Sequence, residues 1–201
     1  HRDPRGRLAA GRDHRLALPV LHLGEEGRGH RQDGQVRGHP RRDPAVHAQL
    51  ERELYGAKLA HHEKLTYKAR DGVEVEAYLT LPVYGEAPYP TVIHPHGGPG
   101  ARDYSGFDPW VSYLTSRGYA VLRPNFRGSS GYGYEFAQAQ MGRWGLEMQD
   151  DITDATKFLI DNGTTNPEKV CIFGASYGGY AATMATVKTP DLFTCAVSFA
   201  G

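Results

Sequence analysis

From residue 51 onward, short apolar runs alternate with helical patterns, and this alternation restricts the fold more than any other feature. The runs end near Ile93, Leu122, Phe173 and Phe199. Between them the longest helical pattern has apolar residues at 144, 148, 152, 155 and 159, which share one helix face. Short buried strands connected through helices form parallel sheets covered on both faces. We therefore expect an α/β fold.

An antiparallel hairpin is predicted before the parallel strands. Leu65, Tyr67 and Ala69 alternate with polar neighbours, Asp71 and Gly72 supply a turn, and the alternation resumes over residues 73–81. The expected architecture is a mostly parallel sheet with an antiparallel hairpin at its N-terminal end.

The first fifty residues differ from the rest in composition. They hold ten of the arginines, no lysine, six carboxylates and six of the ten histidines, and they lack Ile, Phe, Tyr, Trp, Met, Cys, Ser, Thr and Asn. Without aromatic or periodic apolar residues, such a segment cannot offset the entropy lost on ordering. A basic arm, a natural disordered linker and an out-of-frame or misassembled segment are the three interpretations, and the last is preferred. We therefore divide the chain into a non-homologous segment, 1–50, and a folded part, 51–201.

Charge and hydropathy exclude two classes of protein. The 23 basic and 23 acidic side chains cancel, which argues against nucleic-acid binding through bulk positive charge. No run of about 18 apolar residues exists, so no membrane span is expected. Cys171 and Cys195 are too few for a disulfide framework; they fall on strands expected to be neighbours and are interpreted as buried core thiols.

The string Gly174-Ala175-Ser176-Tyr177-Gly178 follows a buried strand and precedes a small-residue helix. A sharp turn at this point would present the Ser176 hydroxyl above the sheet, as in G-x-S-x-G nucleophile turns. The flanking glycines avoid collisions between strand and helix. Ser176 is therefore the candidate nucleophile.

A second string, His96-Gly97-Gly98-Pro99, ends an earlier strand. In α/β hydrolases such a loop offers a backbone N–H to the oxyanion, opposite the N–H of the residue after the nucleophile. We assign the N–H groups of Gly98 and Tyr177 as the oxyanion hole. His94 and His96 lack an accompanying Asp, Glu or Cys cluster, so structural hydrogen bonding is favoured over a metal site, and no metal or other cofactor is expected.

Further polar residues have two interpretations each. Arg127 and Tyr132 are tentative substrate-binding residues, although salt bridges within the loop and packing of a glycine-rich loop are the favoured roles. Asp150, Asp151 and Asp154 are expected on a solvated or loop-capping helix face. Trp144 is expected to anchor its helix in the core.

With these residues in place, the chain from Lys64 to Gly201 resembles the catalytic domain of prolyl oligopeptidase family serine peptidases. The likeness is greatest to the acylaminoacyl-peptidase and dipeptidyl-aminopeptidase branch. It rests on the strings His96–Pro99, Pro124–Gly133, Trp144-Gly145, Asp150-Asp151 and Gly174–Tyr180. The resemblance implies the α/β-hydrolase fold and a Ser, Asp and His triad.

Two departures from the family pattern are expected to matter. The triad order in this fold is Ser, then Asp, then His, and every histidine of this chain precedes Ser176. The family's β-propeller also has no counterpart in residues 1–50. The chain is thus expected to be a catalytic-domain fragment, truncated after the strand that follows the nucleophile helix, with little or no activity of its own.

The resemblance implies a parent enzyme that hydrolyses short peptides through an acyl-enzyme on Ser176. An esterase on the same fold and a non-catalytic remnant are the alternatives. The expected partner is a short peptide substrate, with neither nucleic acid nor a membrane, and oligomeric state is left open. A cytoplasmic location is expected, with periplasmic and secreted locations as alternatives, because the chain does not begin with Met.

Overall fold

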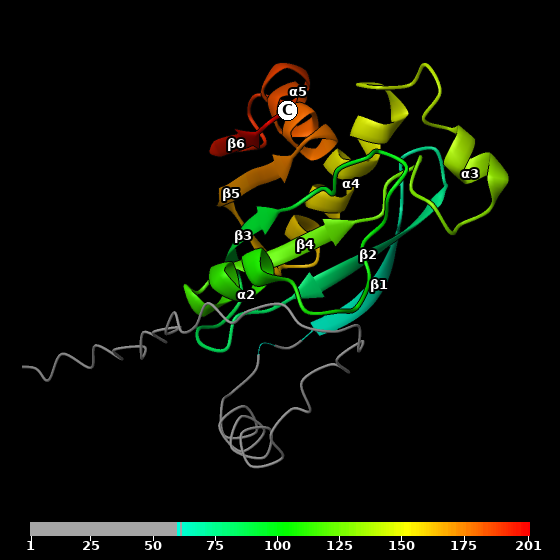
Figure 1. Cartoon of the computed structure of the whole chain (residues 1–201). Coiled ribbons are helices and arrows are strands. Elements are labelled where there is room, and N and C mark those ends of the chain that lie inside the picture. Colours follow the sequence, from blue (N-terminus) through cyan, green and yellow to red (C-terminus); the bar gives the residue numbers. More distant parts are fainter. Residues whose placement is uncertain (1–59, 61) are drawn as a thin grey trace, which may run out of the picture. The chain divides into compact units, whose positions relative to one another are not determined.

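A computed structural model describes residue 60 and residues 62–201. Within this part, one mixed sheet has the strand order β1-β2-β4-β3-β5-β6 (Figure 1). The strands are β1 (His62–Lys68), β2 (Glu74–Thr80), β3 (Tyr89–Ile93), β4 (Ala120–Pro124), β5 (Thr165–Ala175) and β6 (Cys195–Phe199). The helices are α2 (Pro109–Ser116), α3 (Tyr134–Gln138), α4 (Glu147–Asp161) and α5 (Tyr177–Lys188). The predicted alternation of strands and helices is confirmed.

The predicted hairpin is formed by β1 and β2, which pair antiparallel with Tyr67 opposite Val75. β2 also pairs antiparallel with β4, whereas β4, β3, β5 and β6 run parallel to one another. The mostly parallel sheet with an antiparallel hairpin is therefore confirmed, and the carboxyl ends of β3, β4 and β5 meet at one edge.

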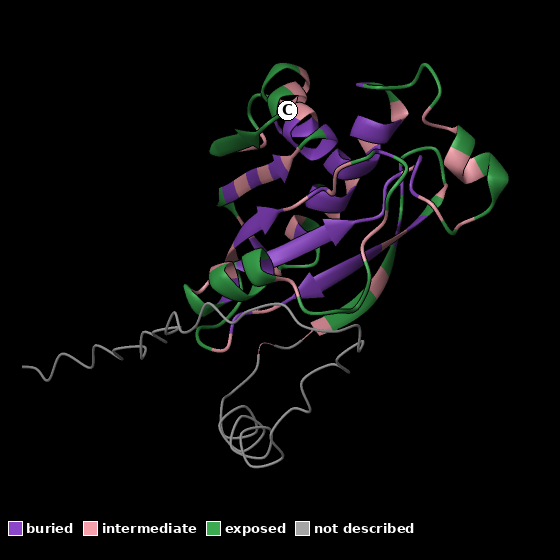
Figure 2. Cartoon of the chain, viewed as in Figure 1, coloured by how far each residue is buried: buried purple, intermediate pink, exposed green. Residues whose placement is uncertain are grey.

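Helices cover both faces of the sheet. Because successive side chains of a strand point to opposite faces, the apolar core is divided into two clusters, one on each face. Val92 and Val121 pack with Val111 of α2 in one cluster. Their neighbours Ile93 and Leu122 belong to a larger cluster with apolar residues of α4 and α5. The central strands are consequently buried along most of their length (Figure 2).

The long helix begins later than the sequence pattern indicates. α4 starts at Glu147, so Trp144 lies before it, and the Trp144 side chain is 51% exposed. The expectation that Trp144 anchors its helix in the core is therefore wrong. Its ring instead covers Tyr177 and Tyr180 of α5, with centroids 5.0 and 5.6 Å away.

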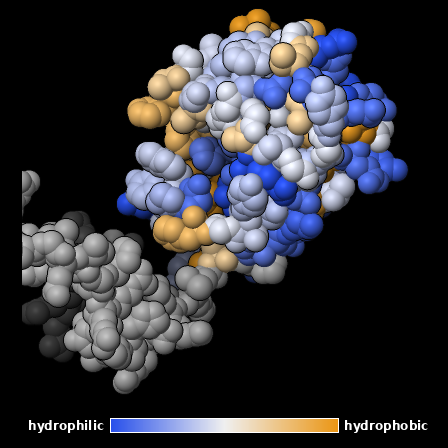
Figure 3. All heavy atoms as spheres, turned by 45° about the vertical axis from the view of Figure 1, so that its right-hand side comes forward, coloured by the Kyte–Doolittle hydropathy of each residue, from blue (hydrophilic) through white to orange (hydrophobic). Residues whose placement is uncertain are grey.

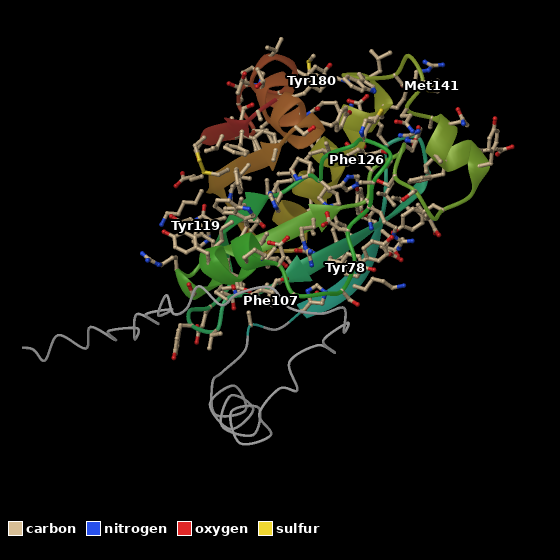
Figure 4. All side chains as sticks on the ribbon, viewed as in Figure 1. Tyr78, Phe107, Tyr119, Phe126, Met141 and Tyr180 are labelled. Atoms are coloured by element: carbon tan, nitrogen blue, oxygen red, sulfur yellow. A yellow bond between two sulfur atoms is a disulfide. The ribbon has the colours of Figure 1, made fainter. Side chains whose placement is uncertain are left out.

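The two cysteines are joined, which corrects their interpretation as core thiols. Cys171 and Cys195 are opposite each other in the β5–β6 register and form a disulfide (Figure 4). Every residue of β6 is exposed, so Cys195 is not in the core. The neighbouring strands were predicted correctly, but the bond depends on a residue-to-residue register that the sequence pattern does not give.

Exposed apolar side chains accompany this arrangement. In the view of Figure 3 they form separate patches among hydrophilic residues. The large apolar side chains that are exposed include Phe107, Trp110 and Tyr113 in or beside α2, and Val197 and Phe199 on β6. Among the described residues, no helix has the length and apolar character needed to cross a membrane. The interpretation of residues 1–50 lies outside the described residues.

Candidate active site

The turn between β5 and α5 has a strained serine at its tip. β5 ends at Ala175, α5 begins at Tyr177, and Ser176 between them has φ 54° and ψ −122°. A positive φ in a residue other than glycine costs about 1–3 kcal/mol, and such residues cluster at functional sites. The Ser176 residue is exposed. The backbone therefore holds a hydroxyl accessible to solvent at the carboxyl end of a central strand.

Glycines beside Ser176 allow β5 and α5 to approach each other closely. A Cβ built on Gly174 would collide with the backbone of Gly178, and one on Gly178 would collide with the carbonyl oxygen of Pro95. The collisions expected from the sequence are therefore present. Alanine at either position would displace α5 and the serine at its start.

The glycine loop after β3 lies directly against the serine. A Cβ on Gly97 would be 3.3 Å from Ser176 Cβ and 3.8 Å from Ser176 Oγ. Gly98 has φ +119°, and a Cβ there would be 2.7 Å from the Ala101 nitrogen, so only glycine fits. Tyr177 is the first residue of α5, and the first N–H groups of a helix have no partner within it. Loop and helix start thus bring two backbone segments together beside one hydroxyl.

Both histidines of the glycine loop make structural hydrogen bonds. His94 Nδ1 lies 2.7 Å from the carbonyl oxygen of Phe173. His96 Nδ1 lies 2.7 Å from the carbonyl oxygen of Gly97, and Nε2 lies 2.8 Å from Ser129 Oγ. Burial lowers the pKa of His96. Within the described part of the chain, no group of three or more potential metal ligands is found.

Arg127 is bound by acidic side chains. Its Nη2 lies 2.6 Å from Asp151 Oδ1, its backbone N–H donates to Asp151 Oδ2 at 2.8 Å, and its Nη1 contacts Asp71. These bonds raise the pKa of Arg127. They correspond to the loop-stabilising role that the sequence pattern favours. Asp151 is fully buried, so of the two predicted roles the solvated face is wrong, whereas its bonds to Arg127 in the loop after β4 agree with the loop-capping role.

Tyr132, the other tentative substrate-binding residue, joins a polar network. Its hydroxyl donates to Glu76 Oε1 at 2.7 Å and accepts from Asn125 Nδ2 at 2.7 Å. Burial and the bond to Glu76 raise its pKa. Tyr132 and Arg127 both line an open pocket of about 550 Å³ beside α3, whereas Ser176, Gly98 and Tyr177 are absent from its described lining. A substrate contact by either residue stays a prediction.

An aromatic cluster beneath the site was not found from the sequence. Phe126 is fully buried in the loop after β4 and packs 4.5 Å from His96 and 5.4 Å from Tyr177, measured between ring centroids (Figure 4). Trp144 and Tyr180 complete the contacts around the Tyr177 ring. The sequence feature that could have predicted this cluster is the density of aromatic residues around positions 126, 144 and 177.

The sheet order, the strained serine after a central strand and the adjoining glycine loop together define an α/β hydrolase with a serine nucleophile turn. Residues 105–201 match the family model described as "Prolyl oligopeptidase family", and residues 39–145 match the model described as acetyl xylan esterase. Over residues 105–201 the chain is therefore that of a prolyl oligopeptidase family protein.

Individual relatives agree with this assignment. The chain is 40% identical over 157 residues to dipeptidyl aminopeptidase BIII of Pseudoxanthomonas mexicana, covering 74% of this chain and 23% of the relative. It is 39% identical to dipeptidyl peptidase family member 6 of Caenorhabditis elegans, and the match covers 67% of this chain and 21% of that relative. The crystal structure of Pyrococcus horikoshii acylaminoacyl peptidase superposes with a TM-score of 0.68 at 28% identity. The match covers 74% of this chain and 24% of that structure's chain. The chain thus spans about a quarter of the length of these relatives.

Proposed function

We propose that this chain supplies the nucleophile and oxyanion-binding part of a serine peptidase that hydrolyses short peptides. The strained, exposed Ser176 beside the Gly97–Gly98 loop is the observation that carries the proposal. Peptide substrates are suggested by the names of the relatives, which are dipeptidyl and acylaminoacyl peptidases. Residues 51–201 would accordingly form the N-terminal portion of the catalytic domain, with residues 1–50 outside it.

The proposed chemistry proceeds through an acyl-enzyme. Ser176 Oγ attacks the scissile carbonyl carbon while a general base takes the hydroxyl proton, and the C–N bond then breaks as the amine leaves with that proton. Water next attacks the ester on Oγ and releases the carboxylic acid. The N–H groups of Gly98 and Tyr177 would stabilise the negative oxygen in both tetrahedral intermediates. The first residues of α5 add the positive end of a helix dipole.

The test is the replacement Ser176→Ala in the enzyme expressed from its whole gene. We expect loss of covalent labelling by a fluorophosphonate probe, and a roughly million-fold lower kcat on an aminoacyl p-nitroanilide. Ser116→Ala is the matched control, because Ser116 is exposed and its hydroxyl only donates to the Tyr113 carbonyl at the end of α2. Full activity in Ser176→Ala would refute the proposal.

An esterase is the second candidate, and the match of residues 39–145 to the acetyl xylan esterase model favours it. Acyl transfer to serine does not itself distinguish an ester from an amide. Parallel kcat/KM values on p-nitrophenyl esters and aminoacyl p-nitroanilides separate the two. A peptidase hydrolyses both, whereas an esterase hydrolyses only the esters at a substantial rate.

The cysteines support a proposal about the cellular compartment. Disulfides persist in oxidising compartments and are rare in the cytosol. The Cys171–Cys195 bond therefore supports the periplasmic or secreted alternative over the cytoplasmic location expected from the sequence. We propose that the protein folds in such an oxidising compartment.

A further inference from the structure

We propose that Gln140 is a specificity-determining residue, whose carboxamide forms one wall of the subsite for a substrate side chain beside the scissile bond. The inference rests on the proposed function, in which Ser176 attacks the carbonyl carbon and the Gly98 N–H binds the oxyanion. Gln140 lies in the segment that connects α3 to α4 (Figure 1), remote in the sequence from both groups.

Three close approaches lead from the nucleophile to Gln140. A Cβ built on Gly97 would be 3.3 Å from Ser176 Cβ, so the glycine loop begins beside the nucleophile. The loop then turns sharply, because a Cβ on Gly98 would be only 2.8 Å from the Gly100 nitrogen. A Cβ on Gly100 would in turn lie 3.4 Å from Gln140 Nε2 and 3.8 Å from Gln140 Oε1. The carboxamide is therefore a neighbour of the residue two positions beyond the oxyanion donor.

Gly100 leaves the space between the loop and the carboxamide open. Gly100 and Gly98 are both exposed, and neither has a side chain. In the tetrahedral intermediate the oxyanion, the acyl-side residue and the leaving residue are all attached to one carbon atom. The side chains on either side of the scissile bond consequently begin close to the oxyanion donor, and the open space at Gly100 can receive one of them.

The side chain of Gln140 is held in place by its surroundings. Its Nε2 donates to the Ala137 carbonyl of α3 at 3.1 Å. Its Cβ lies against Gly128, where an added Cβ would be only 2.9 Å away. Gln140 thus presents a fixed, neutral wall. A carboxamide can donate to or accept from a polar side chain, but it cannot neutralise a charged one. The substrates expected are therefore peptides with a neutral side chain at this position.

Charge replacements at position 140 test the wall directly. In the enzyme expressed from its whole gene, kcat/KM is measured on short peptides in which the residue before or after the scissile bond is Lys, Gln or Glu. We expect Gln140→Glu to raise the ratio of kcat/KM for Lys over Glu by about tenfold at one of these two substrate positions. Gln140→Lys should lower the same ratio at the same position. A side chain with a purely structural role would not give opposite changes.

Gln138→Glu is the matched control, because Gln138 is an exposed residue of α3 and carries the same charge change two residues away. Its Lys over Glu ratio should stay within about twofold of that of the wild-type enzyme, since exposed charges are screened. An equal change in Gln138→Glu, or unchanged ratios in both Gln140 variants at both substrate positions, would overturn the inference.

A further variant narrows the subsite from its opposite side and covers any failure of the charged variants to fold. Gly100→Ala adds a Cβ in front of the carboxamide. At the substrate position identified, or at either one if the charged variants do not fold, kcat/KM should fall at least about fivefold more for Leu than for Gly. Equal losses for Leu and Gly at both positions would contradict the wall. Activity that survives Ser176→Ala would instead refute the proposed function, so the two failures are distinguishable.

Discussion

At the scale of single residues, the most consequential contact away from Ser176 is the ion pair between Arg127 and Asp151. Asp151 is fully buried, and Arg127 donates to it from its backbone N–H, Nε and Nη2. The pair connects the loop after β4 to α4, 24 residues further along the chain. It therefore holds the loop that contains Phe126 and Ser129, the residues that contact His96.

Replacing Arg127 with methionine should destabilise the fold by about 3 kcal/mol, because a buried carboxylate is left without its partner. Burial raises the pKa of Asp151, so without Arg127 the carboxyl becomes protonated more readily in the folded than in the unfolded state. The loss in free energy of unfolding should therefore be greater at pH 7 than at pH 4. Urea unfolding at the two pH values measures both effects.

The matched control is Arg143→Met, because Arg143 pairs with Glu147 at the surface, where the two side chains are 55% and 40% exposed. Exposed pairs contribute at most about 1 kcal/mol. The double variant R127M/D151L should recover part of the stability lost in the single one, since no charge is left buried. Equal losses of stability on replacing the buried Arg127 and the exposed Arg143 would contradict the expectation that the buried ion pair contributes more.

The sequence predicted some of these residues and not others, for identifiable reasons. Ser176 and the glycines around it were predictable, because a strained turn between strand and helix imposes a local residue pattern. The loop-capping role of Asp151 was among the predictions, but its burial was not, because Asp151 flanks the apolar stripe of α4 and its ion-pair partner Arg127 is distant in the sequence. The contact of His96 with Ser129 likewise joins two loops 33 residues apart.

At the scale of elements, β6 is the strand most open to solvent. It is the last strand of the described sheet and all its residues are exposed. Besides the strand pairing, two bonds of β6 residues join the strand to β5 and to the turn after β5. The Cys171–Cys195 disulfide joins the strands, and the N–H of Ser176 donates to the Phe199 carbonyl at 2.9 Å. The strand that carries half of the disulfide thus also supports the turn that holds the nucleophile.

Replacing Cys195 with serine should lower the free energy of unfolding by about 3 kcal/mol, because the bond closes a loop between residues 24 positions apart. Alkylation of the denatured wild-type protein should detect no free thiol before reduction and both cysteines after it. The double variant C171S/C195S also lacks the disulfide. Its free energy of unfolding should therefore lie within about 0.5 kcal/mol of that of C195S. Free thiols in protein purified without reductant would contradict the disulfide, and with it the proposed oxidising compartment.

At the scale of the whole molecule, the mostly parallel sheet with its antiparallel hairpin followed from the sequence, whereas the order of the strands did not. Alternation of apolar residues identifies strands and their buried faces. It does not give the strand order, since β2 and β3 follow each other in the chain but are separated by β4 in the sheet. The pattern could not show that Trp144 lies outside its helix, because a helix start depends on the chain before it. Nor could it show which residues of β5 and β6 face each other, because periodicity is unchanged by a shift of two residues.

The activity of the 201-residue chain depends on which catalytic groups it contains. No histidine follows Ser176 in the 201 residues, and the nearby His96 uses both ring nitrogens in other bonds. Without a general base, a serine hydroxyl is a weak nucleophile at neutral pH. We therefore expect the purified 201-residue chain to hydrolyse an aminoacyl p-nitroanilide roughly a million-fold more slowly than the enzyme expressed from its whole gene.

Two controls make that comparison decisive. The Ser176→Ala variant of the whole enzyme sets the rate without the nucleophile, and the 201-residue chain should fall close to it. Circular dichroism of the 201-residue chain should show the α/β secondary structure described above, so that a low rate reports a missing base and not an unfolded site. Turnover by the pure chain within about a hundredfold of the whole enzyme would mean that a residue within these 201 positions acts as the base. His94, which is bonded through Nδ1 to the Phe173 carbonyl and lies in the loop beside Ser176, would then be the first residue to replace, by His94→Gln.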